Sequence, residues 1–166
     1  MKHFGLIGFP LSHSFSKKYF TDKFKEEGIE DCTYELYPLE NIDDLPKLLN
    51  SNPHLCGINV TIPHKINVLK HLDWIEHDAK VVGAVNCIKV ISQSPISTAF
   101  SGELAFNNDE LWLEGHNTDI HGFDASLSPL INDSFDKALI LGDGGAARAV
   151  KCVLENKGIS YKTVTR

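Results

Sequence analysis

The stretch Asn59-Val60-Thr61-Ile62-Pro63-His64-Lys65 decides the predicted fold, because a strand ends in it and a helix is expected to begin in it. The apolar run 57–60, bounded by a glycine and a proline, predicts a short strand. Pro63 fits the first position of a helix, where its missing N–H costs nothing and its fixed φ is already helical. Lys65 is therefore expected in the first turn of a helix at the carboxyl end of a buried strand, where α/β proteins bind ligands. Taken alone, this lysine is explained by a solvated surface position, and three other polar clusters bear on that interpretation.

The composition is that of an ordinary soluble globular protein. With 166 residues, of which 42% are hydrophobic and 23% charged, the chain can build one good core or two small ones. A formal charge of -6 and a pI near 5.7, without a dense Lys/Arg run, argue against a nucleic-acid surface. The four cysteines form no CxxC pair, and no signal peptide or long apolar run is present, so we expect reduced thiols, a cytoplasmic location and no membrane partner. The eight histidines form no H-x-x-x-H pair, so no metal site is expected.

Two serines lie where the first helix is predicted to begin. The run 3–8 predicts a central strand that ends in a turn at 8–10. The apolar residues of the next segment recur with a helical period before Gly28 stops the helix: Phe15, Tyr19, Phe20 and Phe24. Helix N-capping would explain one serine. Together, the hydroxyls of Ser14 and Ser16 beside free backbone N–H groups also make a site for an anion the size of a carboxylate.

The middle of the chain alternates between predicted strands and helices. A strand is expected at 33–39, a helix at 42–49, short helices at 66–72 and 75–81, and strands at 83–91 and 111–114. Asn86 is a polar residue in the first strand of that last pair, and it either satisfies a local backbone group or offers its amide to a ligand. The segment Ser92–Glu110, rich in Ser, Asn, Gly and Pro, is interpreted as the arm of a hairpin with an irregular excursion.

The cluster Asn117-Thr118-Asp119 opens the next predicted helix. Asn117 or Thr118 would be a reasonable cap, and Asp119 in the first turn suits the helix dipole. Capping therefore explains this cluster locally, without a ligand.

A glycine-rich turn, Gly142-Asp143-Gly144-Gly145-Ala146-Ala147-Arg148, follows a predicted buried strand at 137–141 and precedes an amphipathic helix. This context, with small Ala147 where the third glycine or alanine belongs, favours a dinucleotide-binding fingerprint. The next predicted strand, 161–165, leads to Arg166, at the place where NAD proteins carry an acidic residue that binds the ribose. An arginine there favours the 2′-phosphate of NADP. The Asp143 carboxylate would repel a pyrophosphate unless it points away. The cofactor-binding residues expected are Gly142, Gly144, Gly145, Ala146 and Arg166.

The polar clusters occur in the order and approximate spacing found in shikimate dehydrogenases, and the chain resembles that family over essentially its whole length. The matching segments are 13–16, 59–65, 83–86, 117–119 and 142–148, of which 59–65 is the most specific. The resemblance implies an α/β fold: a three-layer substrate-binding and catalytic domain with a largely parallel sheet, residues 1–128, followed by an incomplete NADP-binding Rossmann domain, residues 129–166. It implies NADP-dependent reduction of 3-dehydroshikimate to shikimate, on the route to aromatic amino acids, by a monomer or homodimer.

The resemblance also assigns roles to individual residues. Substrate binding would fall to Ser14, Ser16, Thr61, Lys65, Asn86 and Asp119. Lys65 and Asp119 would be the catalytic pair, with Lys65 supplying a proton while the nicotinamide supplies a hydride. Because the family's remaining nucleotide-binding residues lie beyond position 166, we expect the 166-residue chain alone to be inactive. The alternatives are a quinate/shikimate dehydrogenase and a non-catalytic module that binds shikimate-type ligands.

Overall fold

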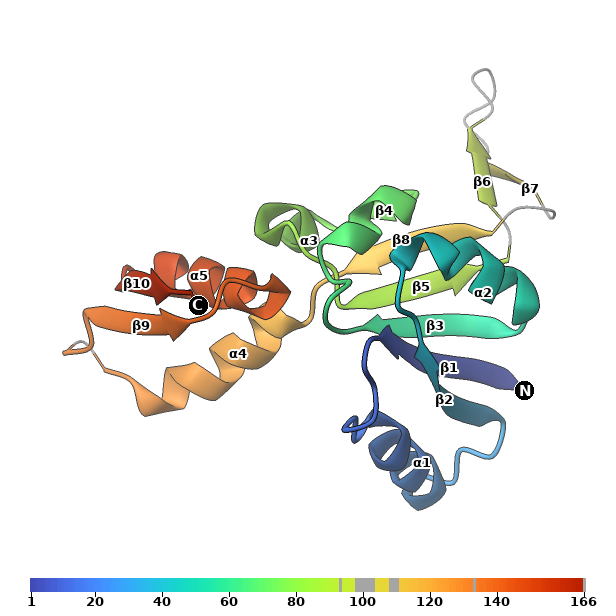
Figure 1. Cartoon of the computed structure of the whole chain (residues 1–166), viewed down its shortest axis with the longest axis horizontal. Helices are drawn as coiled ribbons and strands as arrows, with labels where there is room; N and C mark the ends of the chain where they lie inside the picture. The colour runs from blue at the N-terminus through green and yellow to red at the C-terminus, as the bar shows by residue number, and fades with distance from the viewer. Residues whose placement is uncertain (93, 98–103, 108–110, 133, 166) are drawn as a thin grey trace.

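The computed structural model describes residues 1–92, 94–97, 104–107, 111–132 and 134–165, and it shows an α/β sheet followed by a smaller βαβ unit (Figure 1). The main sheet has six strands in the order β2-β1-β3-β5-β8-β4. Its strands are β1 (Lys2–Gly8), β2 (Cys32–Pro38), β3 (Leu55–Val60), β4 (Trp74–Ile75), β5 (Cys87–Ile91) and β8 (Trp112–His116). β1 pairs in parallel with β2 and β3, and β4 pairs in parallel with β8, whereas β5 is antiparallel to both of its neighbours. The predicted largely parallel sheet is confirmed.

Helices cover both faces of this sheet. Leu6 and Ile7 are consecutive residues of β1, so their side chains point to opposite faces. Leu6 joins a cluster with Tyr34, Phe20 and Phe24, the last two from α1 (Ser16–Glu26). Ile7 joins the larger core, which also holds residues of η1 (Ile42–Asp44), α2 (Leu45–Ser51), η2 (Asn67–His71) and α3 (His77–Val82). The arrangement is therefore the expected three layers.

The apolar face predicted for α1 is only half right. Phe20 and Phe24 pack against the sheet, but Phe15 and Tyr19 are 82% and 59% exposed. The helix covers only the β1–β2 side of the sheet, so one narrow stripe of side chains is enough to bury its inner face. Tyr19 instead rests against the edge of the Phe20 ring, with 5.2 Å between the ring centroids.

The helix predicted to begin at Pro63 does not form. Residues 62–63 and 65–66 form turns, the Ile62–Pro63 peptide bond is cis, and η2 begins only at Asn67. Lys65 therefore lies in the turn between β3 and η2, although it is still at the carboxyl end of β3 as predicted. The short strand β4 was also missed, and it takes the first residue of the helix predicted at 75–81.

Part of the predicted hairpin excursion is described. β6 (Ser94–Ser97) and β7 (Leu104–Asn107) form a separate antiparallel pair between β5 and β8. The rest of the segment Ser92–Glu110, at positions 93, 98–103 and 108–110, lies outside the described residues. The β6–β7 pair projects from the end of the sheet away from the βαβ unit (Figure 1).

The smaller unit follows α4 (Asp119–Leu127) and η3 (Ser128–Leu130). It consists of the parallel strands β9 (Lys137–Leu141) and β10 (Ser160–Val164) with α5 (Gly145–Asn156) between them. A small apolar cluster joins α5 to α4 and to the end of α3: Val82, Ala84, Ile120, Ala149 and Val153. The carboxyl ends of β1, β3 and β8 point towards this unit (Figure 1). In the part of the chain described here, no helix is both long and apolar enough to cross a membrane.

Candidate active site

A lysine and an aspartate form an ion pair at the carboxyl edge of the main sheet. Lys65 comes from the turn after β3, and Asp119 is the first residue of α4. The Lys65 Nζ lies 2.7 Å from Asp119 Oδ2, although 54 positions separate the two residues in the chain. Their side chains are only 14% and 27% exposed, so water screens the pair weakly. The two groups expected to act together are thus in direct contact.

The backbone explains why these two side chains meet. The segment Gly83–Asn86, which connects α3 to β5, runs between the Lys65 turn and the start of α4. The Val85 N–H donates to the Lys65 carbonyl at 2.8 Å, and the Asn86 N–H donates to the His116 carbonyl at 3.0 Å. Because β3 and β8 both lie beside β5 and end at the same edge, their following residues converge there.

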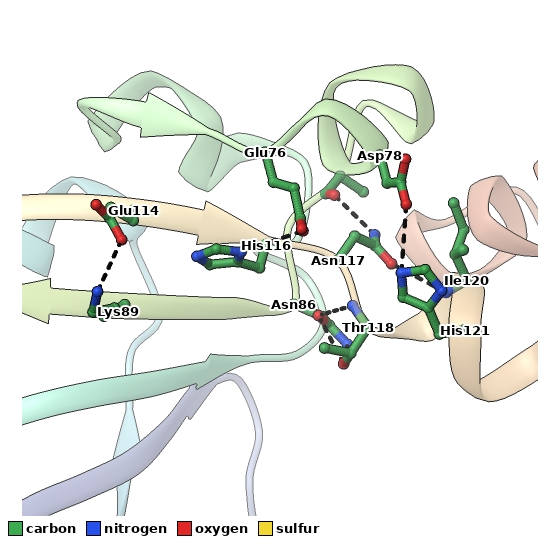
Figure 2. A network of polar contacts seen from close by, with 11 residues as sticks. Glu76, Asp78, Asn86, Lys89, Glu114, His116, Asn117, Thr118, Ile120 and His121 are labelled. Atoms are coloured by element: carbon green, nitrogen blue, oxygen red, sulfur yellow. Dashed lines mark hydrogen bonds and ion pairs between the residues drawn. The ribbon is translucent and has the colours of Figure 1, made fainter.

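The Asn86 side chain fixes the aspartate and the residue before it. Its Nδ2 donates to Asp119 Oδ1 at 2.8 Å and to Thr118 Oγ1 at 2.9 Å. Its Oδ1 accepts from the Thr118 N–H at 2.9 Å, so the asparagine clamps the start of α4 from both sides (Figure 2). Asn86 thus satisfies a backbone N–H, as one of its two interpretations expects, and it also holds a carboxylate of the candidate site. Its role in binding a ligand stays a prediction.

Asn117 caps α4 from inside the protein. It is 1% exposed, its Nδ2 donates to the Ala84 carbonyl at 2.8 Å, and its Oδ1 accepts from the Ile120 N–H at 3.3 Å. Figure 2 shows this side chain pointing from the start of α4 to the end of α3. Thr118 occupies the N-cap position but makes no side-chain cap, because its hydroxyl bonds to Asn86 instead.

The serines lie beside the same end of β3. The Ser16 N–H donates to Ser14 Oγ at 3.3 Å, but the N-cap residue of α1 is Phe15 and no side chain caps the helix, so the expected serine cap does not form. The Tyr34 hydroxyl donates to Asn59 Oδ1 at 2.8 Å and has the Ser16 side chain as a second hydrogen-bonding partner. Burial raises the pKa of Tyr34 well above its ordinary value, although its Ser16 partner acts in the opposite direction, so this phenol stays neutral.

Thr61 is packed against the loop that leads to the serines. Its N–H donates to the Ile7 carbonyl at 2.9 Å, which places it one residue beyond the paired part of β3. A Cβ added to Gly8 would overlap the Thr61 methyl group, so only a glycine allows the β1–α1 loop to approach so closely. Ser14 and Thr61 therefore belong to adjoining loops at one edge of the sheet, and Ser16 is the first residue of α1.

The glycine-rich loop, residues 142–145, lies over the stem of Lys65. A Cβ added to Gly145 would lie 2.6 Å from the Lys65 Cβ, so the backbone of the loop touches the lysine directly. Gly142 has a φ of 105°, which a residue with a side chain rarely adopts. The loop ends at the start of α5, where the first backbone N–H groups have no partner within the helix and attract phosphate. Gly144, Gly145 and Ala146 lie at this helix start, so the cradle fits a nucleotide phosphate.

Asp143 is the one acidic group in this loop. Its Oδ1 lies 2.5 Å from Lys151 Nζ, and this hydrogen-bonded ammonium lowers the pKa of the Asp143 carboxyl. The repulsion expected from this carboxylate is therefore offset by a paired cation. Arg166, expected to contact a 2′-phosphate, lies outside the described residues. Among the residues that the structure does describe, no three or more His, Cys, Asp or Glu side chains gather as a metal site would require.

Sequence reasoning overlooked residues that connect the expected ones. Thr118 and Asn59 stand inside the matching segments, but nothing in their spacing shows which side chains they meet. For Tyr34, the sequence shows only that it lies in a predicted strand, which does not indicate a role in the site. Arg148 ends the glycine-rich segment, and its guanidinium reaches back to the Gly83 carbonyl at 3.1 Å.

Comparisons with known proteins agree with this geometry. A family model described as the shikimate dehydrogenase substrate binding domain matches residues 6–88. The shikimate dehydrogenase (NADP(+)) of Clostridium beijerinckii is 38% identical over 164 residues, which are 96% of this chain and 53% of that protein. That of Methanocaldococcus jannaschii is 37% identical over 154 residues, or 90% of this chain and 47% of the relative. The chain thus spans about half the length of the curated relatives it matches.

Solved structures give the same result. The crystal structure of shikimate dehydrogenase 1 from Peptoclostridium difficile superposes with a TM-score of 0.77 at 33% identity, covering 99% of this chain and 54% of that one. The Thermus thermophilus shikimate 5-dehydrogenase, solved in complex with NADP(H) and shikimate, has a TM-score of 0.74 at 30% identity, covering 100% of this chain and 56% of that one.

Proposed function

Because the chain belongs to the shikimate dehydrogenase family, we propose that it binds shikimate and supplies the proton-transfer groups of an NADP-dependent oxidoreductase that interconverts 3-dehydroshikimate and shikimate. The observation that supports this most is the contact of Lys65 with Asp119 at 2.7 Å, directly beneath the glycine-rich loop. Substrate and nucleotide sites would then meet at one lysine. The relatives' names and the Thermus complex with NADP(H) and shikimate point to the same pair of ligands.

In this proposal, Lys65 handles the proton. Reducing a ring ketone places negative charge on its oxygen, and an ammonium beside that oxygen both stabilises the charge and delivers a proton. Asp119 holds the ammonium in place through Oδ2, while Asn86 holds Oδ1, so the carboxylate cannot rotate freely. In the oxidative direction the same lysine, after losing a proton, accepts one from the ring hydroxyl.

The remaining expected residues would bind and orient the substrate. Ser14, Ser16 and Thr61 offer hydroxyl donors from adjoining loops, which suits a carboxylate and its neighbouring hydroxyl. Asn86 and Asp119 would face ring hydroxyls, exchanging part of their present mutual hydrogen bonding for contacts with the ligand. This leaves the charge of Lys65 for the reacting oxygen.

NADP would be held by Gly142, Gly144, Gly145 and Ala146, with Arg166 expected at the 2′-phosphate. When bound, NADP supplies or removes the hydride. The protein's contribution is the phosphate cradle at the start of α5 and the short path from that cradle to Lys65.

Calorimetric titration of the purified 166-residue chain with shikimate tests the proposal. We expect saturable binding with a Kd in the range of about 1 μM to 1 mM, typical of enzyme substrates. Quinate, titrated in parallel, tests the neighbouring specificity, and tighter binding of quinate would reassign the substrate. A folded chain that binds no shikimate at millimolar concentration would refute the proposal.

The protein encoded by the complete reading frame should reduce NADP+ with shikimate, and binding without any such reduction would establish a binding module instead.

Changing Tyr34 to phenylalanine is expected to weaken shikimate binding by about 5-fold, since one neutral hydrogen bond contributes about 1 kcal/mol. The ring would still stack on Phe20, whose centroid lies 4.4 Å away, so the fold should be retained. Without the hydroxyl, however, the Asn59 amide and the Ser16 side chain lose their common partner.

Titrations of the Tyr34→Phe variant and the parent with shikimate measure this effect. Tyr161→Phe is the matched control, because its hydroxyl bonds to Glu155 in the βαβ unit, away from the serines. Equal affinities for Tyr34→Phe and the parent would show that the phenol does not organise the serine side of the site.

A further inference from the structure

We propose that Arg148 is a positioning residue that latches the glycine-rich loop onto Lys65 and so sets the nucleotide cradle against the Lys65–Asp119 pair. The inference rests on the proposed function only in naming the nucleotide. The latch itself consists of contacts among described residues, and no ligand is needed to form it.

The guanidinium of Arg148 fills a fitted space at the end of α3. Its Nη1 donates to the Gly83 carbonyl at 3.1 Å. Gly83 has a φ of 66°, and its own N–H is already directed back to the Ala79 and Lys80 carbonyls at 2.9 and 3.2 Å. A Cβ at Gly83 would lie 2.7 Å from the Arg148 Nη1, so the arginine occupies the place that a side chain at position 83 would take.

The segment that Arg148 holds is the one that orders the ion pair. Within Gly83–Asn86, the Val85 N–H donates to the Lys65 carbonyl at 2.8 Å. The Ala84 carbonyl accepts from Asn117 at 2.8 Å, and Asn86 donates to Asp119 at 2.8 Å. The hydrogen bond from Arg148 to the Gly83 carbonyl therefore fixes a segment that is itself hydrogen-bonded to both Lys65 and Asp119.

On the other side of the latch, the loop itself touches the lysine. Gly145 is buried, and a Cβ there would lie 2.6, 3.2 and 3.4 Å from the Cβ, Cδ and Cγ atoms of Lys65. Arg148 is three residues further along α5, so its anchor lies almost one turn from this contact. Loop and lysine are thus held together at two adjacent points, one by close packing and one by a hydrogen bond.

The apolar cluster between α3, α4 and α5 cannot supply this alignment alone. Apolar burial is non-directional, so the packing of Ala149 and Val153 does not by itself fix how α5 is placed. A charged donor on a backbone carbonyl at the end of a helix is directional and electrostatically favourable. Lys157 pairs with Asp124 of α4 at 2.6 Å, but only at the far end of α5. Arg148 therefore supplies the directional contact at the end of α5 that faces Lys65.

Lysine labelling in the ligand-free chain tests the latch. The rate at which an amine-acetylating reagent modifies Lys65 is measured by peptide mass spectrometry, relative to exposed Lys18 in the same sample. We expect Arg148→Ala to raise this ratio by about 5-fold or more, the lower end of typical couplings between sites. Millimolar guanidinium chloride should lower the ratio again, since it can occupy the vacated place at the Gly83 carbonyl. Lys137→Ala, which removes a positive charge from the exposed start of β9, is the matched control and should leave the ratio unchanged.

Each outcome decides between a latch and simple stabilisation. If Arg148→Ala only lowers the melting temperature and leaves the Lys65 to Lys18 ratio as in the parent, the latch is refuted. Should Arg148→Ala fail to fold, Arg148→Lys keeps the charge and most of the stem but loses the guanidinium fork, and its ratio must rise for the proposal to stand. Because no ligand is present, a raised ratio in a chain that does not bind shikimate would refute the proposed function and leave the latch intact.

Discussion

Replacing Lys65 by alanine is expected to lower the turnover of shikimate oxidation by about 100-fold or more, the usual contribution of a positioned acid or base. The substitution removes both the proton carrier and the cation beside the reacting oxygen. Asp119 remains held by Asn86, and the serine loops are untouched, so we expect a smaller effect on shikimate affinity than on turnover. The measurement is kcat and KM from NADPH absorbance, in the protein encoded by the complete reading frame.

Lys70→Ala is the matched control for this experiment. Lys70 lies on η2, five positions beyond Lys65, and pairs with Asp43 at 2.5 Å on the surface. It should leave both constants near those of the parent. Turnover of Lys65→Ala within a few-fold of the parent would remove Lys65 from its proposed catalytic role. A raised KM with an unchanged kcat would make it a binding residue.

Replacing Asn117 by leucine is expected to lower the free energy of unfolding by about 2–5 kcal/mol, since a buried group that loses its hydrogen bond costs about 1–3 kcal/mol. The side chain is 1% exposed, and its loss strands the Ala84 carbonyl and the Ile120 N–H. Leucine has the same branched shape but larger end groups, so mild overpacking at this buried site adds to the loss. Domains are stable by only about 5–15 kcal/mol, and the change is therefore a large fraction of the total.

Urea denaturation of the parent and the variant measures this difference. Asn50→Leu is the control, because Asn50 is an exposed residue of α2, and its replacement should alter stability by no more than about 0.5 kcal/mol. A loss below about 1 kcal/mol in Asn117→Leu would show that the freed groups find other partners. The variant should also bind shikimate more weakly, because Thr118 and Asp119 directly follow the capping residue, Asn117.

The strands of the fold were predictable because each one is marked by its own run of residues and by the turn residues beside it. Runs such as 3–8 and 137–141 are apolar and flanked by turn residues, and each forms a strand within a residue or two of its predicted bounds. The burial predicted for 137–141 is wrong, however, because Leu139 and Leu141 are 62% and 79% exposed. Gly28 and Gly158 end their helices with φ values of 68° and 69°, conformations that favour glycine. Phe15 and Tyr19 were misassigned because helical spacing cannot tell how much of a helix a sheet will cover.

The site was predictable in its residue types but not in its contacts. The local explanations of Asn86 and Asn117 are observed, since each satisfies nearby groups, and the same contacts also hold the ion pair. Nothing in the sequence around Lys65 names a residue 54 positions away; only the order of β3, β5 and β8 brings the two together. The turn at Pro63 was missed because a proline suits the first position of a helix and a tight turn equally well.

The segment between β5 and β8 leaves the main sheet at the edge far from the ion pair and returns to it there. Ile91 and Trp112 face each other in the ladder of β5 and β8, at the rim opposite the ion pair. A hairpin turn of a few residues would close that gap, so we expect the length of the segment between these two residues to be changeable without moving the ion pair. That rim is accordingly a natural attachment point for a fluorophore, an affinity peptide or a fused module.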